Sequence, residues 1–228
     1  MTTEFSRPAR AADSLVLYGY WRSSASYRVR MALNLKGLAY QSRTVHLVRD
    51  GGQQHRDSYR KLNPQGQVPT LVHGERVLVQ SLAILEYLEE VFPDVALLPG
   101  DPDGRARVRA LAGVVACDTH PVNNLRVLAY LTGTLGIDEA AKLGWYRHWV
   151  AGGLDAFERM LSDSDETGLC CHGDRPTIAD CCLLPQVYNA RRFDCDESRW
   201  PEVVRIAAHL AGMPEIQRAA PENQPDAE

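Results

Sequence analysis

Two adjacent serines, Ser23 and Ser24, are the residues of this sequence best placed to do chemistry. They stand between an apolar run at residues 15–20 and a segment with helical spacing of apolar residues that ends at Gly37. Hydroxyls at a helix start can cap free N–H groups and, with the positive end of the helix dipole, favour a phosphate, a carboxylate or a thiolate. A purely structural serine cap is the alternative, and these residues alone leave it open.

The elements around the serines follow a recognisable order in the first part of the chain. The first expected elements are a strand at residues 15–20, a loop at 21–26 and a helix at 27–37, with Ser23 or Ser24 as its N-cap and Gly37 as its left-handed C-terminal cap. A strand at 39–47, a polar loop at 48–60, a turn at 63–69, a hairpin at 70–80 that turns at Gly74-Glu75, and a helix at 82–92 with Ser81 as its N-cap follow. A strand–helix–strand unit has parallel strands and a hairpin has antiparallel ones. The sequence therefore predicts a mixed four-stranded sheet.

The second part of the chain is predicted to be helical. Prolines and glycines crowd residues 93–104, and strand patterns nearly vanish beyond them. Helical patterns cover residues 105–130, 138–161 and 177–193, with shorter ones after Pro201 and Pro214, and Thr177 and Asp180 have the spacing of a capping box. The predicted organisation is a disordered extension (1–13), a first domain (14–96), a linker (97–104), an all-helical domain (105–220) and a disordered tail (221–228).

Composition excludes several function classes. The chain has 228 residues, 45% of them hydrophobic, and a net charge of −4, which offers no basic excess for binding nucleic acid. No apolar run is long enough to span a membrane, and residues 1–13 lack the apolar core of a secretory signal. We expect a cytoplasmic protein, with a short mitochondrial presequence as the alternative.

Six cysteines raise the question of metal or disulfide chemistry. None of them forms a C-x-x-C pair, and four of them occur as two adjacent doublets. A metal site would have to collect ligands from the cluster Cys170, Cys171, His172, Cys181 and Cys182. Buried, reduced thiols and no metal are the favoured interpretation.

Several motifs together resemble one family, the zeta class of the glutathione transferases. The matching segments, in family order and spacing, are Ser23-Ser24-Ala25-Ser26-Tyr27-Arg28-Val29-Arg30, Asn63-Pro64, Gln67-Val68-Pro69-Thr70-Leu71, Gln80-Ser81-Leu82-Ala83-Ile84, Leu97-Leu98-Pro99 and Pro185-Gln186-Val187-Tyr188-Asn189-Ala190-Arg191-Arg192-Phe193. The resemblance covers about residues 15 to 220. It implies an α+β thioredoxin-like N-terminal domain followed by an all-α C-terminal domain, the glutathione transferase architecture.

The resemblance also implies which residues bind glutathione as a cofactor. Ser23 would hydrogen-bond the glutathione sulfur, with Ser24 close by, and the backbone of Val68 before a cis Pro69 would pair with the cysteinyl unit. The remaining implied contacts are those of Gln54, of Gln80 and Ser81 with the γ-glutamyl carboxylate, and of His120, Asn124 and Arg126 in the helical domain.

Substrate binding and reaction type follow from the same family. Zeta-class members are maleylacetoacetate and maleylpyruvate isomerases, so the resemblance implies thiolate addition to a maleyl oxo acid, bond rotation and elimination. Arg22 and Arg192 are the candidates to hold the dianionic substrate, since arginine forks suit carboxylates. A homodimer is implied by the superfamily alone.

Two departures from the family pattern bear on the activity. Ala25 replaces the signature cysteine, which disfavours chemistry that needs that thiol, including dehalogenation of small acids by a broader glutathione transferase. His120, within His-Pro-Val-Asn-Asn-Leu-Arg, stands where many relatives carry glutamine and favours the maleylpyruvate branch. Either maleyl oxo acid, a broader transferase activity and a binding module without turnover remain the alternatives.

Overall fold

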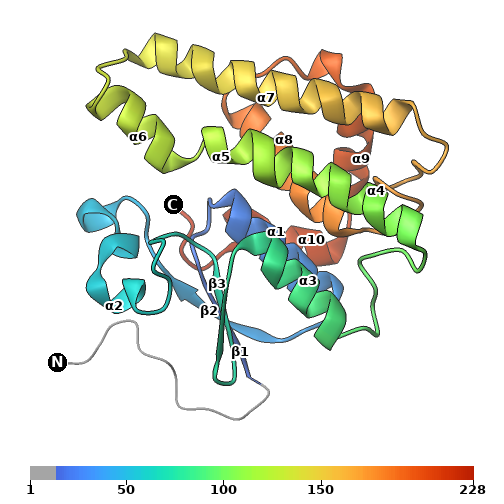
Figure 1. Ribbon diagram of the computed structural model, residues 1–228, viewed down its shortest axis with the longest axis horizontal. Coiled ribbons are helices and arrows are strands. Elements are labelled where there is room, and N and C mark those ends of the chain that lie inside the picture. The colour runs from blue at the N-terminus through green and yellow to red at the C-terminus, as the bar shows by residue number, and fades with distance from the viewer. Residues whose placement is uncertain (1–13) are drawn as a thin grey trace. The chain divides into compact units, whose positions relative to one another are not determined.

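The computed structural model describes residues 14–228, and the expected disordered extension at residues 1–13 lies outside the described part. The described chain divides into two compact units (Figure 1). One unit is Leu97–Met213, and the other combines the described residues up to Ala96 with Pro214–Glu228.

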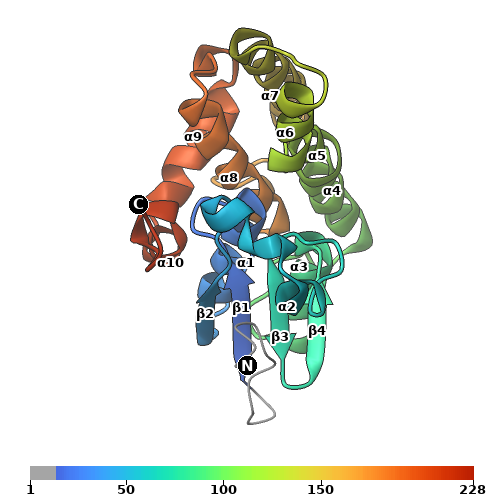
Figure 2. The same ribbon diagram turned by 90° about the vertical axis from the view of Figure 1, so that its left-hand side faces the viewer.

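The first unit is built on a four-stranded sheet. Its strands are β1 (Leu15–Gly19), β2 (Tyr40–Thr44), β3 (Thr70–His73) and β4 (Arg76–Val79). They lie in the order β2-β1-β3-β4, with β1 and β2 parallel and the other pairs antiparallel (Figure 2). The predicted mixed sheet is therefore confirmed.

Helices α1 (Ser24–Leu35), α2 (Asp57–Arg60) and α3 (Ser81–Val91) complete this unit, with two short 3-10 turns at Arg49–Gly51 and Gln53–His55. Alternate residues of β1 point to opposite faces, so Val16 and Tyr18 share a core with Tyr59 from α2. Gly37, two residues after the end of α1, has a φ of +67°, which confirms the predicted left-handed C-terminal cap.

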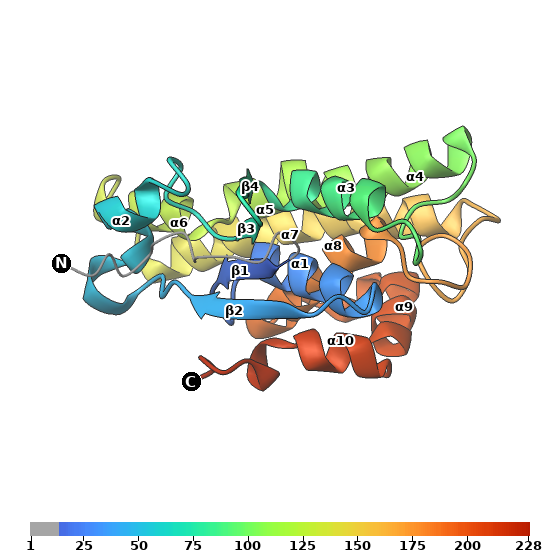
Figure 3. The same ribbon diagram turned by 90° about the horizontal axis from the view of Figure 1, so that it is seen from below.

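The C-terminal segment also belongs to the first unit. Helix α10 (Pro214–Ala219) packs on α1 (Figure 3), and the 3-10 turn Pro221–Asn223 follows it. Arg30 Nε donates to Ala219 O at 2.9 Å. The predictions of a helical domain reaching residue 220 and of a disordered tail at 221–228 are thus not met, because contacts distant in sequence hold this segment.

The second unit is entirely helical. Its elements are α4 (Pro102–Gly113), a π-helical turn (Val114–Thr119), α5 (His120–Val122), α6 (Leu125–Gly133), α7 (Glu139–Ser162), α8 (Ile178–Arg192), a 3-10 turn (Glu197–Arg199) and α9 (Pro201–Ala211). A single helix over residues 105–130 was wrong, because Asn124 adopts an extended conformation (ψ 149°) and starts a new helix. Helix α4 also begins inside the predicted linker, at Pro102.

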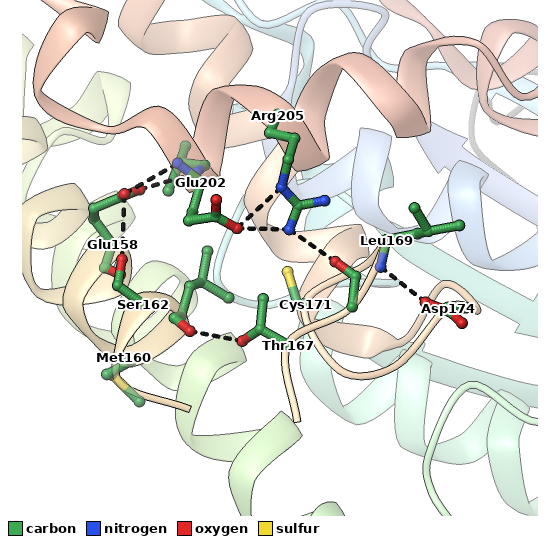
Figure 4. Close-up of polar contacts among 12 residues, drawn as sticks. Glu158, Met160, Ser162, Thr167, Leu169, Cys171, Asp174, Glu202 and Arg205 are labelled. Atoms are coloured by element: carbon green, nitrogen blue, oxygen red, sulfur yellow. Dashed lines mark hydrogen bonds and ion pairs between the residues drawn. The ribbon is translucent and has the colours of Figure 1, made fainter. Parts of the chain in front are cut away.

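Buried carboxylates close two helix starts in this unit, those of α8 and α9. The predicted capping box of Thr177 and Asp180 opens α8, most of whose residues are buried. Trp200 cannot cap α9, and Glu158 from α7 accepts hydrogen bonds from the amides of Glu202 (3.0 Å) and Val203 (2.9 Å) instead (Figure 4). These caps fix where α8 and α9 begin.

Every helix within residues 14–228 is too short or too polar to span a membrane.

Candidate active site

The register of the sheet brings four loops to one end of the first unit. Gly19, at the end of β1, pairs with Thr44, at the end of β2. Tyr18 pairs with Thr70, at the start of β3, and Thr70 pairs with Val79, at the end of β4. The segments that contain Ser23, Gln54, Val68 and Gln80 therefore all leave or enter the sheet at the same end.

Ser23 is the N-cap of α1, one of the two serines that the sequence predicted for this position. Its Oγ accepts a hydrogen bond from Ser26 N at 3.2 Å, and the first helical bond runs from Tyr27 N to Ser23 O at 2.8 Å. Because the oxygen acts as acceptor in the cap, its proton is left to donate elsewhere. The half-buried hydroxyl can thus offer a hydrogen bond to an anion at the positive end of the helix.

The neighbours of Ser23 differ in burial. Ser24 is 8% exposed within the first turn of α1, whereas Arg22 is partly exposed and its guanidinium lies 5.1 Å from the centre of the Trp21 ring. Ala25 follows in the same turn and places no thiol there. This helix start therefore offers hydroxyl and cationic groups.

The turn before β3 is braced from within the unit. The Val68–Pro69 peptide bond is cis, as the resemblance implied. Tyr59 Oη and Asn63 Nδ2 donate to Gln67 O at 2.7 and 2.8 Å. Burial raises the pKa of Tyr59 to about 12, so its hydroxyl keeps the donating proton at neutral pH. The braces hold the backbone of Val68 in place.

The start of α3 departs from the prediction. Ser81 is the first helical residue rather than the N-cap, and Gln80 occupies the cap position with φ 71° and ψ 116° and no side-chain capping bond. A positive φ in a residue other than glycine costs free energy and is found at functional sites. Gln80 Nε2 donates to Gln65 Oε1 at 2.6 Å.

A buried cation stands beside this helix start. Arg28, 3% exposed, reaches from α1 and donates from Nη1 to Ser81 Oγ at 3.2 Å. The positive end of α3 and the guanidinium both favour negative charge. The pair Gln80 and Ser81 thus lies where a carboxylate would be stabilised.

Gln54 contributes a buried amide at the same end of the sheet. It is 6% exposed, and its Nε2 donates to Leu47 O at 3.2 Å. Within the described residues its Oε1 has no hydrogen-bond partner. A buried acceptor in this state suits an N–H donor of a ligand.

The other predicted site residues lie in the second unit. His120 directly follows the π-helical turn, and its Nε2 is 3.5 Å from Asn124 Nδ2. Asn124 is the N-cap of α6, where its Oδ1 accepts from Arg126 N at 3.2 Å. His120 and Asn124 are half-buried, whereas the side chain of Arg126 is exposed.

Arg192 is at the C-terminal end of α8 and is exposed, with its guanidinium 5.0 Å from the centre of the Phe193 ring. That ring stacks on Tyr146 at 3.8 Å between centroids. The neighbouring Arg191 is paired with Glu197 at 2.7 Å. The stacked aromatic pair gives Arg192 an apolar base.

Three residues that contact the candidate site were missed from the sequence. Arg28 and Arg30 belong to the quoted motif, but nothing in their type predicted that both would be buried at 3% exposure. Arg30 donates to the carbonyls of Tyr20 (3.3 Å) and Trp21 (2.9 Å), and burial lowers its pKa to about 10. Asp226 accepts from Trp21 N at 3.1 Å. Arg30 and Asp226 together hold the loop that leads to Ser23.

The cysteines do not assemble a metal centre in residues 14–228, where no group of three or more His, Cys, Asp or Glu side chains could hold an ion. All six are free thiols, and both doublets are buried. Burial raises the pKa of Cys170 to about 12 and that of Cys171 well above its usual range.

Comparison with known proteins identifies the class that this fold and site define. A family model described as "Glutathione S-transferase, N-terminal domain" matches residues 17–96. The chain is 53% identical to a probable maleylacetoacetate isomerase of Vibrio cholerae over 94% of this chain and 99% of that one. The fold is therefore that of a glutathione transferase with a thioredoxin-like first domain.

Comparison with solved structures shows which class of glutathione transferases the chain resembles. The holo structure of a bacterial zeta-class maleylpyruvate isomerase is 48% identical, with a TM-score of 0.91 over 93% of this chain and all of that one. Maleylacetoacetate isomerase from Anaeromyxobacter dehalogenans, solved with bound dicarboxyethyl glutathione and citrate in its active site, is 44% identical with a TM-score of 0.82, over 94% of this chain and 98% of that one. The chain belongs to the zeta class of the glutathione transferases, the maleylacetoacetate and maleylpyruvate isomerase family.

Proposed function

We propose that this protein is a glutathione-dependent isomerase that converts the cis double bond of maleylacetoacetate to the trans double bond of its fumaryl isomer. The observation that carries the proposal is the Ser23 hydroxyl, whose oxygen is used by Ser26 N in the cap of α1 and whose proton is left to donate. Membership of the zeta class supports the same reaction.

The residues of the first unit fit glutathione. Gln54 offers a buried amide oxygen without a partner in the described chain, which suits a peptide N–H of the tripeptide. Val68 offers backbone groups beside the cis Pro69, and the start of α3 with Arg28 suits a carboxylate. We assign Gln54, Val68, Pro69, Gln80 and Ser81 to the binding of this cofactor.

When bound, glutathione supplies the thiolate that adds reversibly to the double bond, and it is released unchanged. Free thiols of this type have a pKa of about 8.5 and are mostly protonated at neutral pH. Ser23 donates a hydrogen bond to the anion and the dipole of α1 favours it, with Ser24 in the same turn. These groups raise the thiolate fraction, and each pKa unit of lowering corresponds to about 1.4 kcal/mol.

Cationic side chains are needed because the substrate is a dianion and the reaction develops further negative charge on its carbonyl oxygen. We assign this role to Arg22 and Arg192, with Arg126 as a third candidate, and we assign His120 and Asn124 to glutathione. Arg22 and Arg192 each lie over an aromatic ring, which restricts the guanidinium without neutralising its charge.

Maleylpyruvate is the second candidate substrate. The chain is 48% identical to a maleylpyruvate isomerase, close to its 53% identity with a probable maleylacetoacetate isomerase. His120 and the residues after it also resemble that branch. The two substrates differ only beyond the ketone, so both belong in the test.

The test is an ultraviolet assay of both substrates with and without glutathione on wild type, Ser23→Ala and Ser23→Thr. We expect glutathione-dependent turnover that falls about 100-fold in Ser23→Ala, the size of effect found when one donor to a reacting anion is removed. Ser23→Thr keeps both cap and hydroxyl and should retain most activity. Asp138→Ala removes the exposed cap of α7 and controls for the loss of a cap alone.

Absence of turnover of both substrates, with glutathione still bound in calorimetry, would overturn the isomerase proposal. A binding module or a transferase that acts on other electrophiles would then be the better interpretation.

We also propose a homodimer in the cytoplasm. The dimer follows from the transferase superfamily, and the cytoplasm from the free thiols. Light scattering should give about twice the chain mass of 25.4 kDa at micromolar concentration. A mass of one chain would refute the dimer.

A further inference from the structure

The wide helical turn before His120 is the most unusual backbone feature of the second unit. Between α4 and α5, residues Val114–Thr119 form a π-helical turn. The backbone N–H of His120 donates to Val115 O, five residues back, and so closes the wide turn. Such turns insert one residue into a helix and occur often at functional sites.

Thr119 holds the turn from inside. It is 3% exposed, and its Oγ1 donates to Val114 O at 2.8 Å, again five residues back. The hydroxyl therefore bonds a carbonyl that the wide turn displaces from its usual helical partner.

The π-helical turn packs against a glycine of α7. A Cβ placed on Gly153 would overlap Thr119 Oγ1 and would lie 2.9 Å from Thr119 Cγ2, closer than such atoms approach in proteins. The adjacent Gly152 has no such neighbour within 4 Å of an added Cβ. Only hydrogen fits at Gly153, whereas Gly152 has room for a methyl group.

The chain after the turn is fastened to the same helix. Trp145 Nε1 donates to Val122 O at 3.0 Å, and Asn123 Nδ2 donates to Tyr146 O at 3.4 Å. Tyr146 and Gly153 are two helical turns apart and therefore lie on one side of α7. This side of α7 thus contacts the chain both at Thr119, before His120, and at Val122 and Asn123, after it.

The extra residue decides where His120 points. Each residue of an α-helix advances the direction of the side chain by about 100°. A regular helix in place of the wide turn would rotate His120 by about that angle relative to α4. The π-helical turn thus sets the direction in which the His120 side chain points.

We propose that Gly153 is a positioning residue of the active site. Because Gly153 has no side chain, Thr119 can pack against α7 and hold the π-helical turn. The turn directs His120 toward the bound molecules, and His120 in turn positions Asn124. The inference rests on the assignment of His120 and Asn124 to glutathione under the proposed function.

The test compares Gly153→Ala with Gly152→Ala, in wild type and in a His120→Ala background. We expect Gly153→Ala to lower kcat/KM for isomerisation by about 10- to 100-fold, the cost of misplacing a site group by an ångström or less. Gly152→Ala should stay within about twofold of wild type, since alanine suits an open helical site. In the His120→Ala background the two alanine variants should differ by less than about threefold, because the group that Gly153 positions is gone.

Equal activity of the two alanine variants, or an undiminished loss from Gly153→Ala in the His120→Ala background, would overturn the inference. The second outcome would mean that Gly153 supports the fold in general. If Gly153→Ala does not fold, Thr119→Val replaces it, since it keeps the shape but removes the bond to Val114 O, and Thr119→Ser should restore activity.

A second readout separates this inference from the proposed function. Nuclear magnetic resonance of histidine labelled at Cε1 detects His120, assigned with His120→Gln, in the absence of any substrate. Gly153→Ala should shift the His120 signal and Gly152→Ala should not. Wild type without turnover refutes the isomerase, whereas an unshifted His120 signal in Gly153→Ala refutes the positioning role.

Discussion

Helices α3 and α8 begin in opposite ways. At α8, the Asp180 carboxylate accepts hydrogen bonds from Thr177 N (2.7 Å), Thr177 Oγ1 (2.8 Å) and Cys171 N (2.9 Å), and it is fully buried. At α3, Gln80 makes no capping bond and has a positive φ, and the cation of Arg28 lies beside Ser81. A carboxylate of the chain closes the start of α8, whereas no side chain caps the start of α3 within the described residues.

The difference shows how the same physical property serves two purposes. Both helix starts present unpaired N–H groups and a positive dipole end. A carboxylate of the chain answers them at α8 and stabilises the fold. At α3, under the proposed function, the carboxylate comes from glutathione. The strained backbone of Gln80 then costs stability in the free protein, and the binding of glutathione offsets that cost. Substitutions at the two sites should therefore separate stability from affinity.

The largest effect on stability is expected for Asp180→Ala. The variant leaves buried donors at the start of α8 without an acceptor, so the free energy of unfolding should fall by about 3 kcal/mol or more. Urea denaturation measures it, with Asp138→Ala, at the exposed start of α7, as the control that should lose about 1 kcal/mol. Equal losses in the two variants would show that burial of the cap adds nothing.

Ser81→Ala should have the opposite profile. It removes a hydroxyl at the start of α3, so the KM for glutathione should rise about tenfold, which corresponds to about 1.4 kcal/mol. The free energy of unfolding should fall by less than in Asp180→Ala, because Arg28 Nη1 loses one acceptor but no cap is lost. Ser42→Ala, on the exposed strand β2, is the control for serine removal and should change neither quantity.

Of these two helix starts, only that of α8 was predicted correctly from the sequence. Thr177 and Asp180 carry a local pattern, the capping box, and it was predicted correctly. Gln80 and Ser81 were read as the end of a strand and an N-cap, because backbone strain held by surrounding structure leaves no local pattern. The Ser23 cap, the left-handed Gly37 and the hairpin at Gly74 were found because each depends on a few adjacent residues.

Features that depend on distant residues were missed. The π-helical turn interrupts the helix that was predicted at residues 105–130. Thr119 of this turn packs against Gly153, which lies on another helix. The C-terminal segment joins the first unit through Asp226, which accepts from Trp21 N, and through Ala219 O, which accepts from Arg30 Nε. Both pairs are far apart along the chain. Residue periodicity records neither kind of contact.

Substitution of Gln80 tests whether the open helix start is strained. Glycine adopts positive φ readily and alanine does not, so Gln80→Gly should be more stable than Gln80→Ala by about 1 kcal/mol. Both variants lose the bond to Gln65 and should bind glutathione more weakly to the same extent. Thermal unfolding and calorimetric titration with glutathione measure the two effects. Equal stability of the variants would mean that the conformation at Gln80 relaxes.

The smallest effect is expected at the start of α1, which both caps itself and serves the ligand. Asp226→Ala removes the acceptor for Trp21 N in the loop before Ser23, while Arg30 still holds the carbonyls of Tyr20 and Trp21. One hydrogen bond of this kind contributes about 1 kcal/mol, so the free energy of unfolding should fall by that amount or less.

The effect of Asp226→Ala on turnover should be a few-fold loss of kcat/KM, because the loop keeps its second brace. Asp226→Asn retains an oxygen that can accept from Trp21 N and should behave as wild type. Steady-state kinetics with varied glutathione compares the three proteins. If Asp226→Asn loses as much as Asp226→Ala, the negative charge of Asp226 matters rather than its hydrogen bond, and the loop before Ser23 is held electrostatically. If neither variant differs from wild type, Arg30 alone positions the loop. The start of α1 would then not depend on Asp226, just as the start of α8 does not depend on a ligand.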